Sequence, residues 1–139
     1  MSRPQRPKAS WRWLQLAVTA CVAVLVVFVE NRFMPEHVWL VVAVWNVTPL
    51  LLALGAVAVA RSSHGSLEVR VFGTVFWVTQ VILVTYFHAA WLFDLEQIAT
   101  RSSTAGLIFF DIPLYSVVGG FLIAGVSMAA VAVFARTAA

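Results

Sequence analysis

The sequence predicts an all-α membrane protein, an up-down bundle of four transmembrane helices with both termini in the cytoplasm. Three observations lead to this prediction: the composition, four long apolar stretches and an uneven distribution of basic residues. Hydrophobic residues make up 62% of the 139 residues and charged residues 11%, whereas about a quarter of the residues of a soluble domain are charged. We therefore expect the membrane part to account for the whole chain.

The four apolar stretches define the expected spans. A bilayer core about 30 Å thick is crossed by roughly 20 apolar residues in a helix, which places the spans at about 13–33, 38–60, 70–93 and 112–135. Together they form one transmembrane domain over 13–136, preceded by a basic and disordered cytoplasmic tail over 1–12. Short connections between spans favour antiparallel neighbours in a four-helix bundle.

The basic residues set the orientation, because lysine and arginine near span ends are retained in the cytoplasm. With the N-terminus inside, seven basic residues lie on the inner side and two on the outer side. The inner residues are Arg3, Arg6, Lys8, Arg12, Arg61, Arg70 and Arg136, and the outer ones are Arg32 and Arg101. We expect a multi-pass protein of the plasma (inner) membrane. Apart from the tail the basic residues are spread singly, so a nucleic-acid partner is not expected.

The fourth apolar stretch, residues 104–134, is longer than a bilayer requires. As one helix it would measure about 45 Å. Two arrangements stay open. Either a continuous helix tilts or protrudes, or the helix breaks at 111–113 and leaves 106–110 as a short interfacial piece. In the second case Pro113 would lie in the first turn of the helix and Asp111 close to its cap.

Polar side chains of all four spans fall in the outer layer of the predicted bundle, and intramembrane ionisable groups are candidate functional residues. The candidates are Glu30, Asn46, Thr85, His88, Asp111 and Tyr115. Thr85 and His88 share one face of the third span, and Tyr115 follows Asp111 on the same side of a continuous helix. We interpret the group as an outward-facing polar vestibule for a proton, a metal ion or a small polar ligand. The alternative is that these groups only contact water and head groups.

The fourth span also carries small residues at regular spacing. Ser116, Gly120 and Ala124 are four residues apart, and Gly125 lies on an adjacent line. Small residues so spaced let two helix backbones approach closely. They could pack within the chain, against a second copy or against another membrane protein.

Three functional hypotheses follow. The first is a non-catalytic subunit or interaction partner in a membrane complex, whose partners are the lipid bilayer and either another membrane protein or a second copy bound through the fourth span. The second is a small ion, proton or metal transporter or channel that uses the vestibule. The third is a haem-binding redox protein, with His37 and His88 as iron ligands. No catalytic triad or multi-histidine cluster is evident in the sequence, so an enzyme is not expected and no cofactor is predicted.

Overall fold

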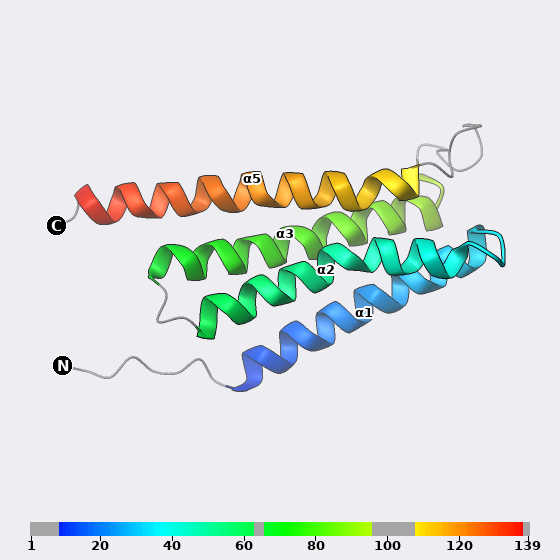
Figure 1. The fold of residues 1–139 in the computed structure, drawn as a ribbon, viewed down its shortest axis with the longest axis horizontal. Helices are drawn as coiled ribbons and strands as arrows, with labels where there is room; N and C mark the ends of the chain where they lie inside the picture. Colours follow the sequence, from blue (N-terminus) through cyan, green and yellow to red (C-terminus); the bar gives the residue numbers. More distant parts are fainter. Residues whose placement is uncertain (1–8, 63–65, 96–107, 138–139) are drawn as a thin grey trace.

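The computed structural model describes residues 9–62, 66–95 and 108–137, and its regular elements are helices. These are α1 (Ala9–Phe33), α2 (Trp39–Ser62), α3 (Leu67–Leu92) and α5 (Ile108–Thr137). The described chain is therefore all-helical, as predicted, and all four helices are long and apolar enough to cross a membrane. Figure 1 shows them side by side along their lengths. Residues 1–8 of the predicted tail, and Arg101, lie outside the described residues.

The helix boundaries differ most from the predicted ones at the starts of α1 and α5. α1 begins at Ala9, so the last part of the predicted tail is helical. α5 begins at Ile108 and continues through Pro113 without a break. Of the two arrangements left open by the sequence, the structure has the continuous helix. Its 30 residues amount to about 45 Å, so α5 must tilt or protrude from a bilayer core of about 30 Å.

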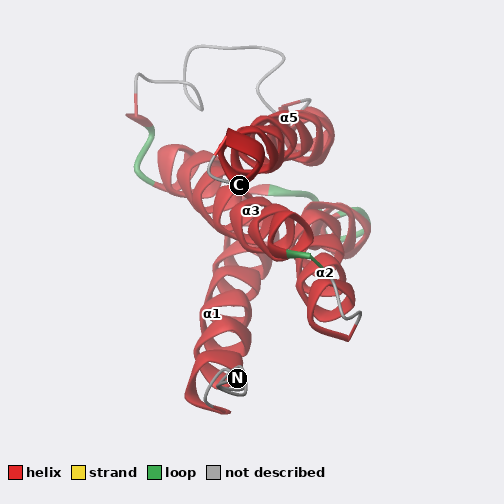
Figure 2. Cartoon of the chain, turned by 90° about the vertical axis from the view of Figure 1, so that its left-hand side faces the viewer, coloured by secondary structure: helices red, strands yellow, loops and turns green. Residues whose placement is uncertain are grey.

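The helices are not packed as four equivalent partners. α2 and α3 form a central pair, and each of them contacts all three other helices, whereas α1 and α5 scarcely touch. Figure 2 shows α1 and α5 on opposite sides of this pair. Successive helices run in opposite directions, so the first turn of α1 and the last turn of α5 lie at the same end (Figure 1).

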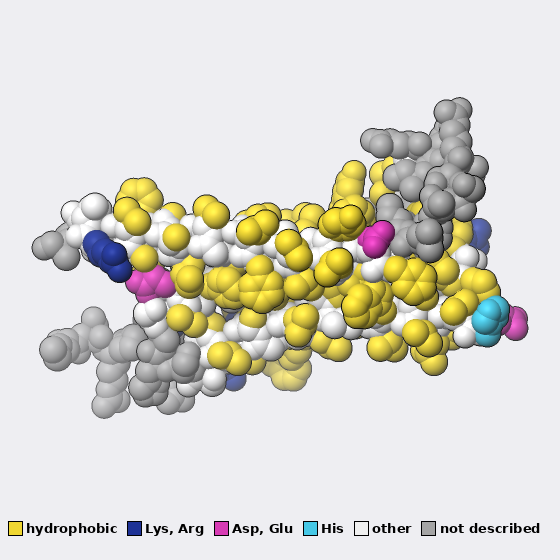
Figure 3. All heavy atoms as spheres, turned by 45° about the horizontal axis from the view of Figure 1, so that its top comes forward, with side chains coloured by type: hydrophobic (Ala, Val, Ile, Leu, Met, Phe, Trp, Pro, Cys, Tyr) yellow, Lys and Arg dark blue, Asp and Glu magenta, His cyan; other side chains and the backbone are white. Residues whose placement is uncertain are grey.

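We name the two ends of the molecule by a residue at each. The Glu30 end is where α1 and α3 finish and α2 and α5 begin, and the Arg61 end is the opposite one. Hydrophobic side chains cover the middle of the face in Figure 3, and the charged side chains visible there lie toward the two ends. This distribution is typical of helices whose middle lies in hydrocarbon.

The small residues of α5 pack against α3. Ser116, Gly120 and Ala124 are all buried. A Cβ atom on Gly120 would lie 2.0 Å from Nε2 of Gln80, so only glycine allows this approach of the two helices. Around Gly125, by contrast, a Cβ atom would meet nothing within 4 Å. Three of the four predicted packing residues are therefore used within the chain itself.

Candidate functional site

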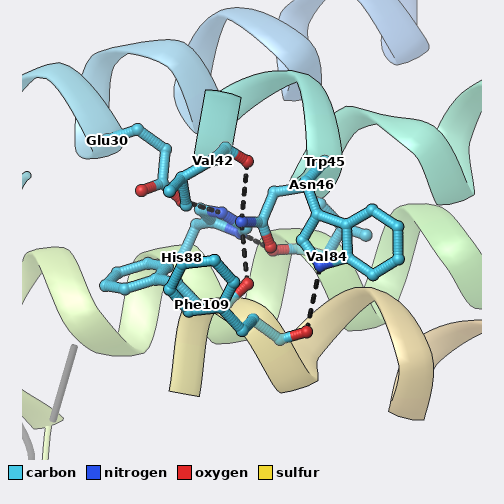
Figure 4. A network of polar contacts seen from close by, with 8 residues as sticks. Glu30, Val42, Trp45, Asn46, Val84, His88 and Phe109 are labelled. Carbon is cyan, nitrogen blue, oxygen red and sulfur yellow. Dashed lines mark hydrogen bonds and ion pairs between the residues drawn. The ribbon is translucent and has the colours of Figure 1, made fainter. Parts of the chain in front are cut away.

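A buried polar cluster lies at the Glu30 end, where α1, α2 and α3 each contribute one side chain (Figure 4). Glu30 comes from the end of α1, Asn46 from the first half of α2 and His88 from the end of α3. All three side chains have 0% of their surface exposed. The structure thus brings together three of the six predicted vestibule residues, in a closed cluster rather than an open cavity.

Glu30 and His88 are linked through one proton. Nε2 of His88 lies 3.3 Å from Oε1 of Glu30, and Nδ1 lies 2.8 Å from the carbonyl oxygen of Val84. Because a carbonyl oxygen can only accept, Nδ1 must carry a hydrogen atom. The second nitrogen therefore either donates to a carboxylate or accepts from a carboxyl group. In both forms the pair holds a single proton on its facing atoms and has no net charge.

The surroundings of the Glu30–His88 pair favour the form without a net charge. The only charged residue of α2 is Arg61, at the opposite end of the molecule, and Asp111 of α5 has an exposed side chain. Gain or loss of a proton by the Glu30–His88 pair would therefore leave a net charge among apolar neighbours, without a counter-ion on α2 or α5. Burial of an uncompensated charge is costly.

Asn46 and its neighbour Trp45 fasten the start of α5 to α2. Pro113 has no N–H group for the carbonyl of Phe109, which is four residues earlier in the helix. Nδ2 of Asn46 donates to that carbonyl over 2.9 Å, and Nε1 of Trp45 donates to the carbonyl of Phe110 over 3.0 Å. Asn46 therefore satisfies a backbone acceptor that Pro113 leaves free, a role that the sequence analysis did not predict.

Asp111 and Tyr115, two of the predicted vestibule residues, do not join the cluster of Glu30, Asn46 and His88. Both are exposed, Tyr115 to 66%. They do share one side of α5, but Phe109 and Ile112 are the residues that face the bundle, and both are buried. At 100° per residue, Asp111 lies far around the helix from Phe109. Asp111 also occupies the first turn of α5, where an acid is favourable because of the helix dipole.

Three oxygen atoms of this layer are buried without a hydrogen-bond partner in the described part of the chain. They are Oε2 of Glu30, Oδ1 of Asn46 and Oγ1 of the half-buried Thr85. Each can accept a hydrogen bond. Buried polar atoms are nearly always satisfied in folded proteins, so three unsatisfied acceptors in one layer are unusual, and among them only the carboxyl oxygen of Glu30 can hold a proton.

A second polar layer lies toward the Arg61 end. The guanidinium group of Arg61 donates to Oε1 of Gln15, and Nε1 of Trp77 donates to Oγ1 of Thr19 over 3.0 Å. From the sequence, Arg61 was expected only to help orient the protein in the membrane. Nothing in the sequence indicates that Gln15 pairs with Arg61, which is 46 positions away.

An apolar layer separates the two polar layers. Val22, Val26, Leu50 and Val84 form one buried cluster. Val26 precedes Glu30 by one turn of α1, and Val84 precedes His88 by one turn of α3. Gln80 lies between this apolar cluster and Trp77 on α3 and is buried with a hydrogen bond to the carbonyl of Ser116, so the middle of the described bundle is mainly, but not wholly, apolar.

His88 is poorly placed to bind iron. One ring nitrogen faces the Val84 carbonyl and the other faces Glu30, so iron binding would disrupt one of these contacts. His37 is exposed in the turn between α1 and α2. Within residues 9–62, 66–95 and 108–137, no group of three or more metal-ligating side chains lies close together.

Comparisons of the chain with family models, with curated proteins and with solved structures give no match. Its function is therefore argued from the fold and the site alone.

Proposed function

We propose that the chain is a non-catalytic subunit or interaction partner in a membrane complex. The supporting observation is the exposure of α5. Of the most apolar 18-residue stretch of α5, only 11% is buried, compared with 33% to 39% of the corresponding stretches of the other three helices. One side of α5 packs against α3, and the opposite side is free for another helix.

The free side of α5 has the composition of a helix-packing surface. Leu122, Val126, Ala129 and Val133 are exposed and follow one another at intervals of four, three and four residues. This spacing places them on one face of a helix. In a bilayer, helices associate through close van der Waals packing of such faces. We assign this face, rather than the small residues buried against α3, to the partner, either another membrane protein or a second copy.

The proposed orientation is an up-down bundle in the plasma membrane with the Arg61 end in the cytoplasm. Among the described residues, Arg12, Arg61, Arg70 and Arg136 belong to that end and Arg32 to the other. Such an asymmetry orients membrane proteins with the basic end inside.

Photo-crosslinking in native membranes tests the proposed surface. A photoreactive residue at Val126 is expected to give a discrete crosslinked product, and adding Leu122→Trp, one turn away on the same exposed face, is expected to weaken recovery of that product. The matched control is Val41, which is similarly exposed on α2 (66%, compared with 71% for Val126). Equal crosslinking from both positions, or none from Val126, would contradict the proposed surface.

A second candidate function, proton-linked transport, is favoured by the buried Glu30–His88 pair. The apolar layer of Val26, Leu50 and Val84 argues against a path through the middle of one chain, so a path would have to run between subunits. In proteoliposomes we would expect Glu30→Gln and His88→Asn to abolish proton flux. Asp111→Asn serves as the control, because Asp111 lies outside the cluster. The absence of any flux from wild-type protein would exclude this candidate.

A further inference from the structure

A groove between α1 and α2 at the Arg61 end has a charged mouth and apolar walls. Its lining residues are Arg12, Gln15, Leu16, Leu54, Val57, Ala58, Arg61 and Ser62. The two arginines and Ser62 belong to the end of the molecule, whereas Ala58, Val57 and Leu54 lie progressively further toward the middle of α2. The groove thus changes from cationic to apolar along the direction in which a lipid lies.

The two arginines lack an acidic partner. The guanidinium groups of Arg12 and Arg61 are close enough to repel each other. The acid of α3 at this end, Glu68, interacts instead with Arg136 of α5. Glu30, whose Oε1 lies 3.3 Å from Nε2 of His88, belongs to the opposite end. Within the described ranges, no carboxylate lies within ion-pair distance of the two cations at the mouth of the groove.

Gln15 shows that the site is preformed. Its side chain is 1% exposed, and its Oε1 accepts a hydrogen bond from Arg61. That contact restrains the guanidinium group at the mouth of the groove. Nε2 of Gln15 has no hydrogen-bond partner within the described ranges, so the groove also contains a buried donor that no protein atom satisfies.

We propose that this groove binds one anionic phospholipid from the adjacent leaflet. The guanidinium groups of Arg12 and Arg61 hold the phosphate, because planar guanidinium groups form charge-assisted hydrogen bonds to phosphate oxygens. An acyl chain lies along Leu16, Leu54 and Ala58. Basic pockets between membrane helices recognise anionic head groups in this manner. The proposal goes beyond the partner surface of α5, because the groove lies on the other side of the central helix pair.

Native mass spectrometry of the purified chain, with added phosphatidylglycerol or phosphatidylcholine, tests the charge requirement. Wild-type protein is expected to retain phosphatidylglycerol about tenfold more strongly, because the choline ammonium group of phosphatidylcholine cancels the charge of its phosphate and is repelled by the two guanidinium groups. Arg12→Gln is expected to remove most of this preference. Arg12 is exposed, so its substitution leaves the core intact. Equal retention of the two lipids by wild-type protein would overturn the proposal.

Arg70→Gln is the matched control, because Arg70 is exposed at the same end but does not line the groove. It removes the same charge and is expected to leave the preference unchanged. Equal losses in Arg12→Gln and Arg70→Gln would mean that the lipid responds only to surface charge, and would overturn the groove as the site.

The apolar wall and the source of the phosphate need separate measurements. Ala58→Phe is expected to reduce phosphatidylglycerol retention by filling the groove, whereas Val44→Phe, at an exposed position of the same helix, is not. Glycerol 3-phosphate is expected not to compete with the lipid. Unchanged retention by Ala58→Phe, or effective competition by glycerol 3-phosphate, would show a site for a free anion and overturn the lipid assignment.

Discussion

Gly120 allows α3 and α5 to pack closely because it has no side chain. The Cβ atom of alanine at this position would lie 2.0 Å from Nε2 of Gln80 and 2.9 Å from the ring of Phe76. Gln80 also donates to the carbonyl of Ser116 over 2.8 Å, so its displacement would cost a hydrogen bond. Gly120→Ala should destabilise the chain by about 1–3 kcal/mol, the usual cost of overpacking.

Gly125→Ala provides the comparison, because a Cβ atom there meets nothing within 4 Å. Thermal unfolding of the two variants in the same detergent checks the difference. Similar melting temperatures for both variants would contradict the prediction, because they would mean that α3 and α5 can move apart at Gly120 at little cost in stability.

At the scale of the helix, the start of α5 depends on a side chain of α2. Asn46 donates to the Phe109 carbonyl that Pro113 leaves without a helical donor. Asn46→Ala should therefore destabilise the chain by about 1 kcal/mol. Pro113→Ala restores an N–H group at position 113, so the same Asn46 substitution should cost less in that background.

A double-mutant cycle of Asn46→Ala and Pro113→Ala, followed by unfolding in micelles, measures this dependence. Additive effects of the two substitutions would show that Asn46 does not replace the donor lost at Pro113. Thr48→Ala is a useful reference, because Oγ1 of Thr48 bonds only within α2, to the carbonyl of Val44.

The same helix shows what could and could not be predicted from the sequence. A long apolar run indicates a span whatever its neighbours are, so the four helices were predictable. The rotation of each helix about its axis depends on packing, so the outward direction of Asp111 and Tyr115 was not. Pro113 was ambiguous because proline is accepted in a first turn and also inside a membrane helix when a neighbour satisfies the freed carbonyl. The neighbour, Asn46, is 63 residues away from Phe109 in sequence.

At the scale of the whole molecule, the proposed orientation follows from the charges at the two ends. Glu36 is exposed in the turn at the Glu30 end, and Ser62 and Thr137 are exposed at the Arg61 end. Cys21 is the single cysteine and is exposed, so Cys21→Ala gives a background in which new cysteines can be labelled one at a time. On intact cells, a membrane-impermeant maleimide should label Glu36→Cys.

The same reagent should reach Ser62→Cys and Thr137→Cys only after the membrane is permeabilised. Labelling of the two positions at the Arg61 end without permeabilisation would reverse the orientation, and comparable labelling at both ends would indicate two orientations in the membrane. Charge explains why neither result is expected. Inversion would require Arg12, Arg61, Arg70 and Arg136 to lie on the outer side in exchange for Arg32, against the retention of basic residues in the cytoplasm that orients membrane proteins.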